Sequence, residues 1–263
     1  MERSHPITRG YRLSDPPPEP GKTSHVDFVD DMVALLDALD IPKVFLVGKD
    51  FGSSIAYLLA LLYPNRISGV VTLGLPFGVP FRPLSAVAHH KGLPEGFYIS
   101  RWKEPGRAEA DFRCFDAKTV VRNIYILFSK SEIPIAGENE EIMDMVEPST
   151  PLPPWLTDED MAAYGALYEK SGFQTGLQVP YRSGVNAQTL GLTRFENQSS
   201  GNADHGGGVF KFPGMEDYIR SGEVKTDVPN LETIYAPEGS HFVQEQFPDQ
   251  VNQLLLTFLN SHS

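Results

Sequence analysis

The stretch KVFLVGKDFGSSIAYLLALLYP, residues 43–64, decides the fold of this chain. Its beginning, KVFLVG, is a short apolar run of the kind found in strands that are buried on both faces. Its end, SSIAYLLALLYP, places apolar residues at helical spacing. Between the two segments, Gly48 and Gly52 flank Asp50. We therefore predict a strand, a sharp turn with Asp50 at its apex, and a helix.

Asp50 stands where the strand-to-helix motif G-x-S-x-G has a serine. Such a turn lifts its apical side chain above the strand ends, and small flanking residues let the backbone pack closely around it. A carboxylate is ionised at neutral pH and attacks carbon without a base, which suits formation and later hydrolysis of an ester. The N–H of Phe51, at the helix N-terminus, is a candidate oxyanion-hole donor. The alternative is that Asp50 only caps the helix.

His241 is the second candidate catalytic residue. It lies in PEGSHFVQEQFP, residues 237–248, after the predicted strand LETIYA and before a predicted closing helix. In chain order, the histidine of a hydrolase triad belongs at this place. Alone, His241 would be read as a loop or capping histidine. An aspartate turn followed by a late histidine favours catalysis.

Strands and helices alternate on either side of a long insertion. ISGVVTLGLPF, residues 67–77, predicts the next buried strand, and the alternation indicates an α/β fold with a mostly parallel sheet and flanking helices. From about residue 80 to 182 the sequence changes to Pro- and aromatic-rich helical patches, which indicates an inserted helical cap. We predict the N-terminal part of the core at 1–79, the cap at 80–182 and the remaining core at 183–263.

The composition excludes several classes of partner. The 263 residues include 22 Lys+Arg and 34 Asp+Glu, for a net charge of -12, and no basic run gathers the positive charges. Nucleic acid and anionic membranes are therefore poor partners. Cys114 is the single cysteine, and no signal-peptide core or apolar stretch of bilayer length occurs, so we expect a cytoplasmic protein. His89 and His90 lack acids at ligand spacing, and we expect no metal or organic cofactor.

Four motifs make the chain resemble the plant-type soluble epoxide hydrolases of the α/β-hydrolase fold. They are GKDFG around Asp50, LPEGFYISRWKEPGRAEADF at 93–112, SGFQTGLQVPYR at 171–182 and the segment around His241. The likeness weakens only around 184–208. It implies hydrolysis of a small-molecule epoxide to a vicinal diol, in which Asp50 forms an ester and His241 activates water. Fatty-acid, cutin-type and xenobiotic epoxides all fit the resemblance.

The resemblance also implies that Tyr98 and Tyr181 hydrogen-bond the epoxide oxygen. A phenol of pKa about 10 can donate to a developing alkoxide without itself being ionised. Other aromatic residues of the predicted cap are candidates for the wall of an apolar pocket, with core packing as the alternative. These wall candidates are Phe97, Trp102, Trp155 and Phe173. We assign a packing role to Tyr125, Tyr164 and Tyr168.

The chain departs from the family pattern in its early part. The family's H-G-x-P loop, which supplies the second oxyanion-hole N–H, does not occur in this sequence. By resemblance, the chain begins beyond the fourth strand of the usual fold, and KVFLVG becomes an exposed apolar edge, which is a template for aggregation or for pairing with another chain. A homodimer paired through this edge is one candidate assembly, and we expect an ester on Asp50 that forms faster than it is hydrolysed.

Two further departures concern the triad acid and the residue before Asp50. TRFENQSSGNADHGGG, residues 193–208, replaces the hydrophobic strand that ends in the triad acid of relatives, and we predict no strand there. Asp204 is the nearest acid in chain order, with a solvated loop as the alternative. Lys49 stands where many relatives have histidine, and we interpret it as a loop cation.

Two other functions remain open on the sequence alone. A haloalkane dehalogenase forms the same aspartyl ester, but it commonly has tryptophan directly after the nucleophile, where this chain has Phe51. A truncated, catalytically inactive relative that binds apolar ligands is the alternative from another class. A serine esterase is disfavoured because the apex of the turn carries no serine.

Overall fold

The computed structural model describes residues 4–77, 93–183, 204–205 and 215–262. The chain divides into two compact units. We call residues 29–92, 128–133 and 185–263 the sheet unit, and residues 1–28, 93–127 and 134–184 the helical unit. The domain boundaries at residues 79 and 182 stay a prediction, and His89 and His90 lie outside the described residues.

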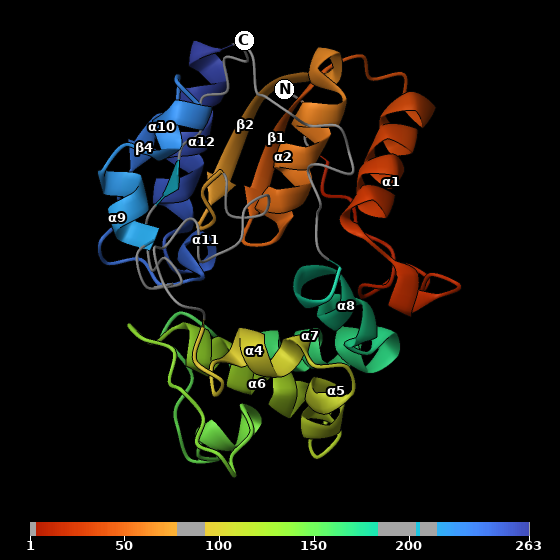
Figure 1. The fold of residues 1–263 in the computed structure, drawn as a ribbon, viewed down its shortest axis with the longest axis vertical. Helices are drawn as coiled ribbons and strands as arrows, with labels where there is room; N and C mark the ends of the chain where they lie inside the picture. The colour runs from red at the N-terminus through yellow and green to blue at the C-terminus, as the bar shows by residue number, and fades with distance from the viewer. Residues whose placement is uncertain (1–3, 78–92, 184–203, 206–214, 263) are drawn as a thin grey trace. The chain divides into compact units, whose positions relative to one another are not determined.

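A parallel strand pair lies at the centre of the sheet unit. β1 (Val44–Lys49) pairs in parallel with β2 (Ile67–Leu73), with Lys49 opposite Leu73 at the C-terminal end. α2 (Gly52–Leu62) connects the two strands and packs against both of them (Figure 1). This strand–helix–strand order confirms the predicted α/β fold. Among the described residues β1 pairs only with β2, and the side chain of Val47 is 51% exposed.

A second, shorter strand pair follows. β3 (Asp204–His205) pairs in parallel with β4 (Thr233–Ile234), and β3 also lies against β2. Our prediction that residues 193–208 contain no strand was therefore wrong. The local sequence is polar and rich in glycine, and it is the pairing with a distant strand that makes these two residues extended.

The sheet unit contains further helices besides α2. They are α1 (His25–Ala38, which begins in the helical unit), α9 (Met215–Arg220), α10 (Val224–Asp227), α11 (Val243–Gln246) and α12 (Pro248–Ser261). Phe258 and Leu259 of α12 pack on Val71 of β2, and Val251 packs near Leu73. Val251, Phe258 and Leu259 thus form the face of the last helix that packs on β2.

The helical unit consists of short helices joined by loops. They are α4 (Tyr98–Lys103), α5 (Arg107–Phe112), α6 (Ala117–Phe128, whose last residue belongs to the sheet unit), α7 (Asp158–Ser171) and α8 (Gln174–Tyr181). Thr157 caps α7: its hydroxyl accepts from the N–H of Asp160, and the Asp160 carboxylate accepts from the Thr157 N–H. In the part of the chain that the structure describes, no helix combines the length and the apolar character needed to cross a bilayer.

Candidate active site

The predicted turn places Asp50 between the end of β1 and the start of α2. Asp50 has a φ of 51°, in the left-handed region that residues with a side chain rarely adopt. The turn is held on both sides. The N–H of Asp50 donates to the carbonyl of Leu73 (2.9 Å), and the carbonyl of Asp50 accepts from the N–H of Ser53 (2.9 Å). Bonds to a strand and a helix thus fix a strained residue, as is common at functional sites.

Only one of the two flanking glycines is required by packing. A Cβ on Gly48 would lie 2.7 Å from the Cα of Ser53 and 2.9 Å from the carbonyl oxygen of Gly52. A Cβ on Gly52 would meet nothing within 4 Å. The close approach of strand and helix therefore depends on Gly48.

His241 lies next to Asp50 in the sheet unit. Its Nε2 is 3.8 Å from Oδ2 of Asp50, and the two side chains are 10% and 26% exposed. The loop before α11 carries His241, and the Ser240 hydroxyl accepts from the N–H of Phe242 (3.2 Å). The rings of Phe128 and Phe242 lie 5.8 and 4.9 Å from the imidazole, centroid to centroid. The tertiary fold therefore brings the predicted nucleophile and the predicted base together.

Lys49 is the third charged residue of this group. Its Nζ lies 3.2 Å from Nδ1 and 3.1 Å from Nε2 of His241. The nearly equal distances place the ammonium between the two ring nitrogens rather than on the lone pair of one. Our interpretation of Lys49 as a loop cation was wrong, because it is the last residue of β1 and is partly buried against His241.

The protonation states of these three side chains are coupled. Burial raises the pKa of Asp50, while the charge of Lys49 and a hydrogen bond from the N–H of Phe51 oppose that rise. Burial, followed by the charge of Lys49, holds the pKa of His241 well below its usual value. Burial lowers the pKa of Lys49 to about 8, against the opposing charges of Asp50 and Glu245. A change of charge on any one of the three therefore shifts the other two.

Tyr98 and Tyr181 lie in one aromatic cluster of the helical unit. Tyr98 begins α4 and is fully buried, and Tyr181 ends α8. Their ring centroids are 6.1 Å apart, and the Trp102 ring lies 5.1 Å from Tyr98 and 5.4 Å from Tyr181. Phe97 adds a fourth ring, 4.8 Å from Tyr98. The two predicted donors and two of the wall candidates thus come from distant segments into one cluster.

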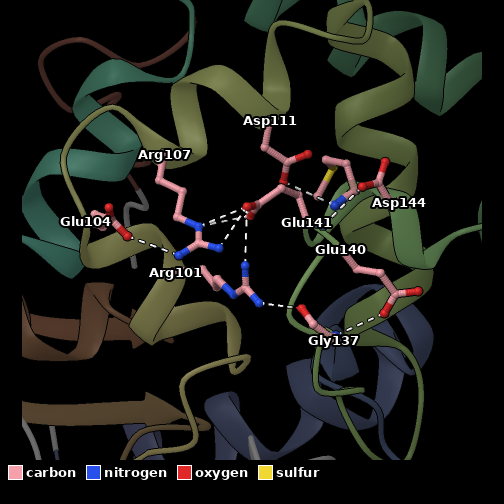
Figure 2. Close-up of polar contacts among 9 residues, drawn as sticks. Arg101, Glu104, Arg107, Asp111, Gly137, Glu140, Glu141 and Asp144 are labelled. Carbon is pink, nitrogen blue, oxygen red and sulfur yellow. Dashed lines mark hydrogen bonds and ion pairs between the residues drawn. The ribbon is translucent and has the colours of Figure 1, made fainter.

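Ion pairs hold the helix that carries Tyr98. Figure 2 shows Arg101 and Arg107 converging on Glu141, with Nη1 of Arg101 3.3 Å and Nη2 of Arg107 2.9 Å from the Glu141 Oε1. Arg101 also donates to the carbonyl of Gly137 (2.6 Å). Arg101 is only 3% exposed and belongs to α4, so these contacts fix the orientation of that helix.

A second ion pair follows Tyr181. Arg182 donates two hydrogen bonds to the carboxylate of Glu109, at 2.5 and 2.7 Å. It also donates to the carbonyl of Trp102 (3.2 Å). These contacts connect the end of α8 with α4 and α5, and they hold the pKa of Glu109 below its usual value.

The remaining site candidates have separate surroundings. Phe173 lies 5.3 Å from Phe112, which lies 5.4 Å from Trp102, so Phe173 borders the cluster that contains Tyr98. Trp155 packs with Tyr125, 6.1 Å away, in another part of the helical core. Asp204 is the first residue of β3, opposite Thr233. Within the described part of the chain, no three His, Cys, Asp or Glu side chains gather as a metal site requires.

Sequence reasoning missed Lys49 and Arg182 as site residues. For Lys49 a signal was present, because a charged residue at the C-terminal end of a parallel strand lies at the edge where such sheets bind ligands. For Arg182 the sequence contains no comparable signal, since its partner Glu109 lies in a different helix.

The comparisons with known proteins agree on one family. A family model described as the alpha/beta hydrolase fold matches residues 6–102. "Epoxide hydrolase 2" of Siraitia grosvenorii is 32% identical over 97% of this chain and 81% of the relative, and "Epoxide hydrolase 3" of the same plant is 33% identical over 97% and 82%. Among solved structures, an epoxide hydrolase from Vigna radiata is similar with a TM-score of 0.82 and 28% identity, covering 97% and 81% of the two chains. Potato epoxide hydrolase I has a TM-score of 0.80 and 26% identity, with 97% and 82% covered.

Proposed function

This chain belongs to the epoxide hydrolase family of the α/β-hydrolase fold, and we propose that it converts an epoxide to a vicinal diol through an ester on Asp50. The observation that carries the proposal is a carboxylate on a strained turn with the Nε2 of His241 3.8 Å away. A carboxylate nucleophile beside a neutral base serves the two successive steps, ester formation and ester hydrolysis.

In the first step, an oxygen of Asp50 attacks a ring carbon and the C–O bond of the epoxide breaks. The ring oxygen leaves as an alkoxide and requires hydrogen-bond donors. We assign this role to Tyr98 and Tyr181, supported by the proximity of their rings within the helical unit. We propose that the helical region at 80–182 acts as the cap, with Phe97, Trp102, Trp155 and Phe173 among its apolar wall residues.

In the second step, His241 removes a proton from water, and the hydroxide attacks the carbonyl carbon of the ester. The N–H of Phe51, which donates to the carboxylate of Asp50 in the resting site, is our candidate oxyanion donor for the tetrahedral intermediate. Collapse of the intermediate releases the diol and restores the carboxylate. Asp204 is our candidate for the acid that orients His241.

The proposed substrate is a small-molecule epoxide with apolar substituents. Aromatic residues dominate the surroundings of Tyr98, which supports a lipid or xenobiotic epoxide over a strongly polar one. We also propose a cytoplasmic location and a role in epoxide detoxification. The exposed Val47 side chain on β1 supports a homodimer that pairs through this strand.

Isotope labelling tests the mechanism directly. In water labelled with ¹⁸O, the diol from a single turnover should contain no label, because its new oxygen comes from Asp50, and the peptide that contains Asp50 should gain ¹⁸O. Asp50→Asn should form neither ester nor diol when first mixed with a styrene-type or fatty-acid epoxide. Label in the first diol would mean direct attack by water and would contradict the ester mechanism. Halide release from a haloalkane without any diol from epoxides would instead indicate the dehalogenase.

A further inference from the structure

We infer that Lys49 is a positioning residue whose charge follows that of Asp50. It is an ammonium while Asp50 is a carboxylate, and it gives up its proton when Asp50 becomes an ester. In the ester state, the neutral amine then supports His241 as the base. This inference rests on the proposed function, because it requires the ester on Asp50.

The geometry that carries the inference is the contact of the Lys49 amine with His241, from the residue that directly precedes Asp50. Lys49 directly precedes Asp50 at the end of β1, and its Nζ lies within 3.2 Å of both ring nitrogens of His241. Three titratable groups from three elements face it: the charges of Asp50 in the turn and Glu245 in α11 raise its pKa, and its own charge lowers the pKa of His241 in the loop before α11. A rotation of the flexible Lys49 side chain that brings the amine onto the lone pair of either ring nitrogen is sufficient for the two groups to exchange a proton.

The two chemical steps need opposite charges on Lys49. Ring opening needs an ionised Asp50, and the ammonium favours ionisation against the effect of burial. Ester hydrolysis needs His241 to accept a proton, and an imidazolium 3.1 Å from an ammonium would be strongly disfavoured. A lysine with a fixed positive charge would therefore help the first step and hinder the second.

Ester formation itself removes the conflict. The charge of Asp50 is one of two that keep the pKa of Lys49 as high as about 8 despite burial. When Asp50 becomes a neutral ester, this charge disappears and the Lys49 pKa falls further. Lysine then loses its proton at neutral pH, which lysines do readily when they are buried.

The protons balance over the cycle. In the first step Asp50 loses its negative charge, Lys49 releases one proton, and the ring oxygen gains one proton, by way of the tyrosines and solvent. In the second step water gives one proton to His241 and a hydroxide to the ester. Collapse breaks the bond between the ester carbon and the diol oxygen, the proton of the added hydroxyl goes to that departing oxygen, and Asp50 returns to a carboxylate that holds one oxygen of the water. The imidazolium passes its proton to the Lys49 amine, and the resting charges of Lys49 and Asp50 are restored.

Two substitutions separate the steps. Lys49→Arg keeps a positive charge that cannot be lost, so ester formation should stay within about threefold of wild type while ester hydrolysis slows at least tenfold. Lys49→Met removes the charge, so ester formation at pH 7 should slow at least tenfold and recover at higher pH as Asp50 ionises. Rapid quenching with intact-mass detection of the ester measures both steps in the full chain. Near-ultraviolet circular dichroism shows whether each variant is folded.

The wild-type protein provides a test that needs no variant. Its rate of ester hydrolysis should rise with pH to a plateau, with a midpoint below about 8, and this midpoint should be absent in Lys49→Arg. The inference is overturned if both variants keep the wild-type ratio of the rate of ester formation to the rate of ester hydrolysis, whether or not the two rates fall. A wild-type protein that forms neither ester nor diol would overturn the proposed function instead, and the two failures are therefore distinguishable.

Discussion

The Nε2 of His241 lies 3.8 Å from the Oδ2 of Asp50, although one residue follows β1 and the other precedes α11. This distance is too long for a hydrogen bond and leaves the carboxylate oxygen available to attack carbon. It is short enough for the imidazole to reach a water that approaches the carbonyl carbon of an ester. One arrangement of two side chains thus serves both steps of the proposed reaction.

Replacing His241 should separate these steps. In His241→Gln we expect the ester on Asp50 to form but to be hydrolysed about 10²–10⁴-fold more slowly, because the general base is lost. Intact-mass spectrometry after mixing with epoxide would then show a lasting adduct. His262→Gln is the matched control, since His262 lies at the end of α12 and stacks on Phe258. Wild-type ester hydrolysis in His241→Gln would exclude His241 as the base.

Removing either tyrosine hydroxyl should slow ring opening. We expect Tyr98→Phe and Tyr181→Phe each to reduce the rate of ester formation about 10²-fold, because the alkoxide loses a donor. Tyr125→Phe is the control, since Tyr125 stacks on Tyr164, at 5.6 Å and 6°, in another part of the helical core. If all three variants form ester at the wild-type rate, Tyr98 and Tyr181 have only a packing role.

The two glycines beside Asp50 should respond differently to alanine. Gly48→Ala places a Cβ 2.7 Å from the Cα of Ser53, so we expect it to lower the free energy of unfolding by about 1–3 kcal/mol. Gly52→Ala should be neutral or raise the free energy of unfolding by up to about 1 kcal/mol, because its Cβ meets nothing and alanine restricts the unfolded chain. Urea denaturation of both variants measures the difference. Equal effects would contradict the close approach at Gly48.

His25 should make the protein less stable in acid. Burial lowers its pKa from 6.5 to about 4, while the Ser183 hydroxyl lies 3.3 Å from Nδ1. The unfolded chain therefore binds a proton below about pH 6.5 that the folded chain does not bind until about pH 4. The contribution of His25 to stability is complete above pH 6.5 and falls by at most about 3 kcal/mol towards pH 4. Urea titrations at several pH values should show that His25→Gln lacks this loss. If the free energy of unfolding of His25→Gln falls with pH as steeply as that of the wild type, His25 is not buried and neutral in the folded chain.

Asp111 should have the opposite pH dependence. Burial, with the charges of Glu141 and Asp144, raises its pKa from 3.8 to about 6 although it accepts a hydrogen bond from the N–H of Met143. The folded chain holds a proton that the unfolded chain releases, so the contribution of Asp111 is complete below pH 3.8 and is lost as pH rises through about 6. We expect Asp111→Asn to be about 1–2 kcal/mol more stable at pH 7, after solvent screening, and no more stable at pH 3.5. If Asp111→Asn is more stable than the wild type by the same amount at pH 7 and at pH 3.5, the charge of Asp111 is not responsible for the difference.

The sequence alone determined the turn and placed the candidate nucleophile at its apex. Residues 43–64 contain the apolar run, the paired glycines, the aspartate and the helical spacing in one continuous segment, and the bonds that form the turn connect near neighbours or adjacent strands. Order along the chain was also enough to select His241. The motifs of the resemblance selected Tyr98 and Tyr181, whose rings lie in one cluster of the helical unit.

Only the tertiary structure decided which charges act on Asp50 and His241. The position of Lys49 at the end of a predicted strand indicated the ligand-binding edge of the sheet, but only the tertiary structure shows that its amine lies 3.1 Å from a histidine in a distant loop. β3 was missed because its two residues become extended by pairing with β4, against the preference of a glycine-rich segment. In both cases the deciding interaction joins residues far apart in the chain. Local sequence determines backbone shape through short-range sterics and hydrogen bonds, whereas burial and charge proximity, which set the protonation of Lys49 and His241, arise only when distant segments pack together.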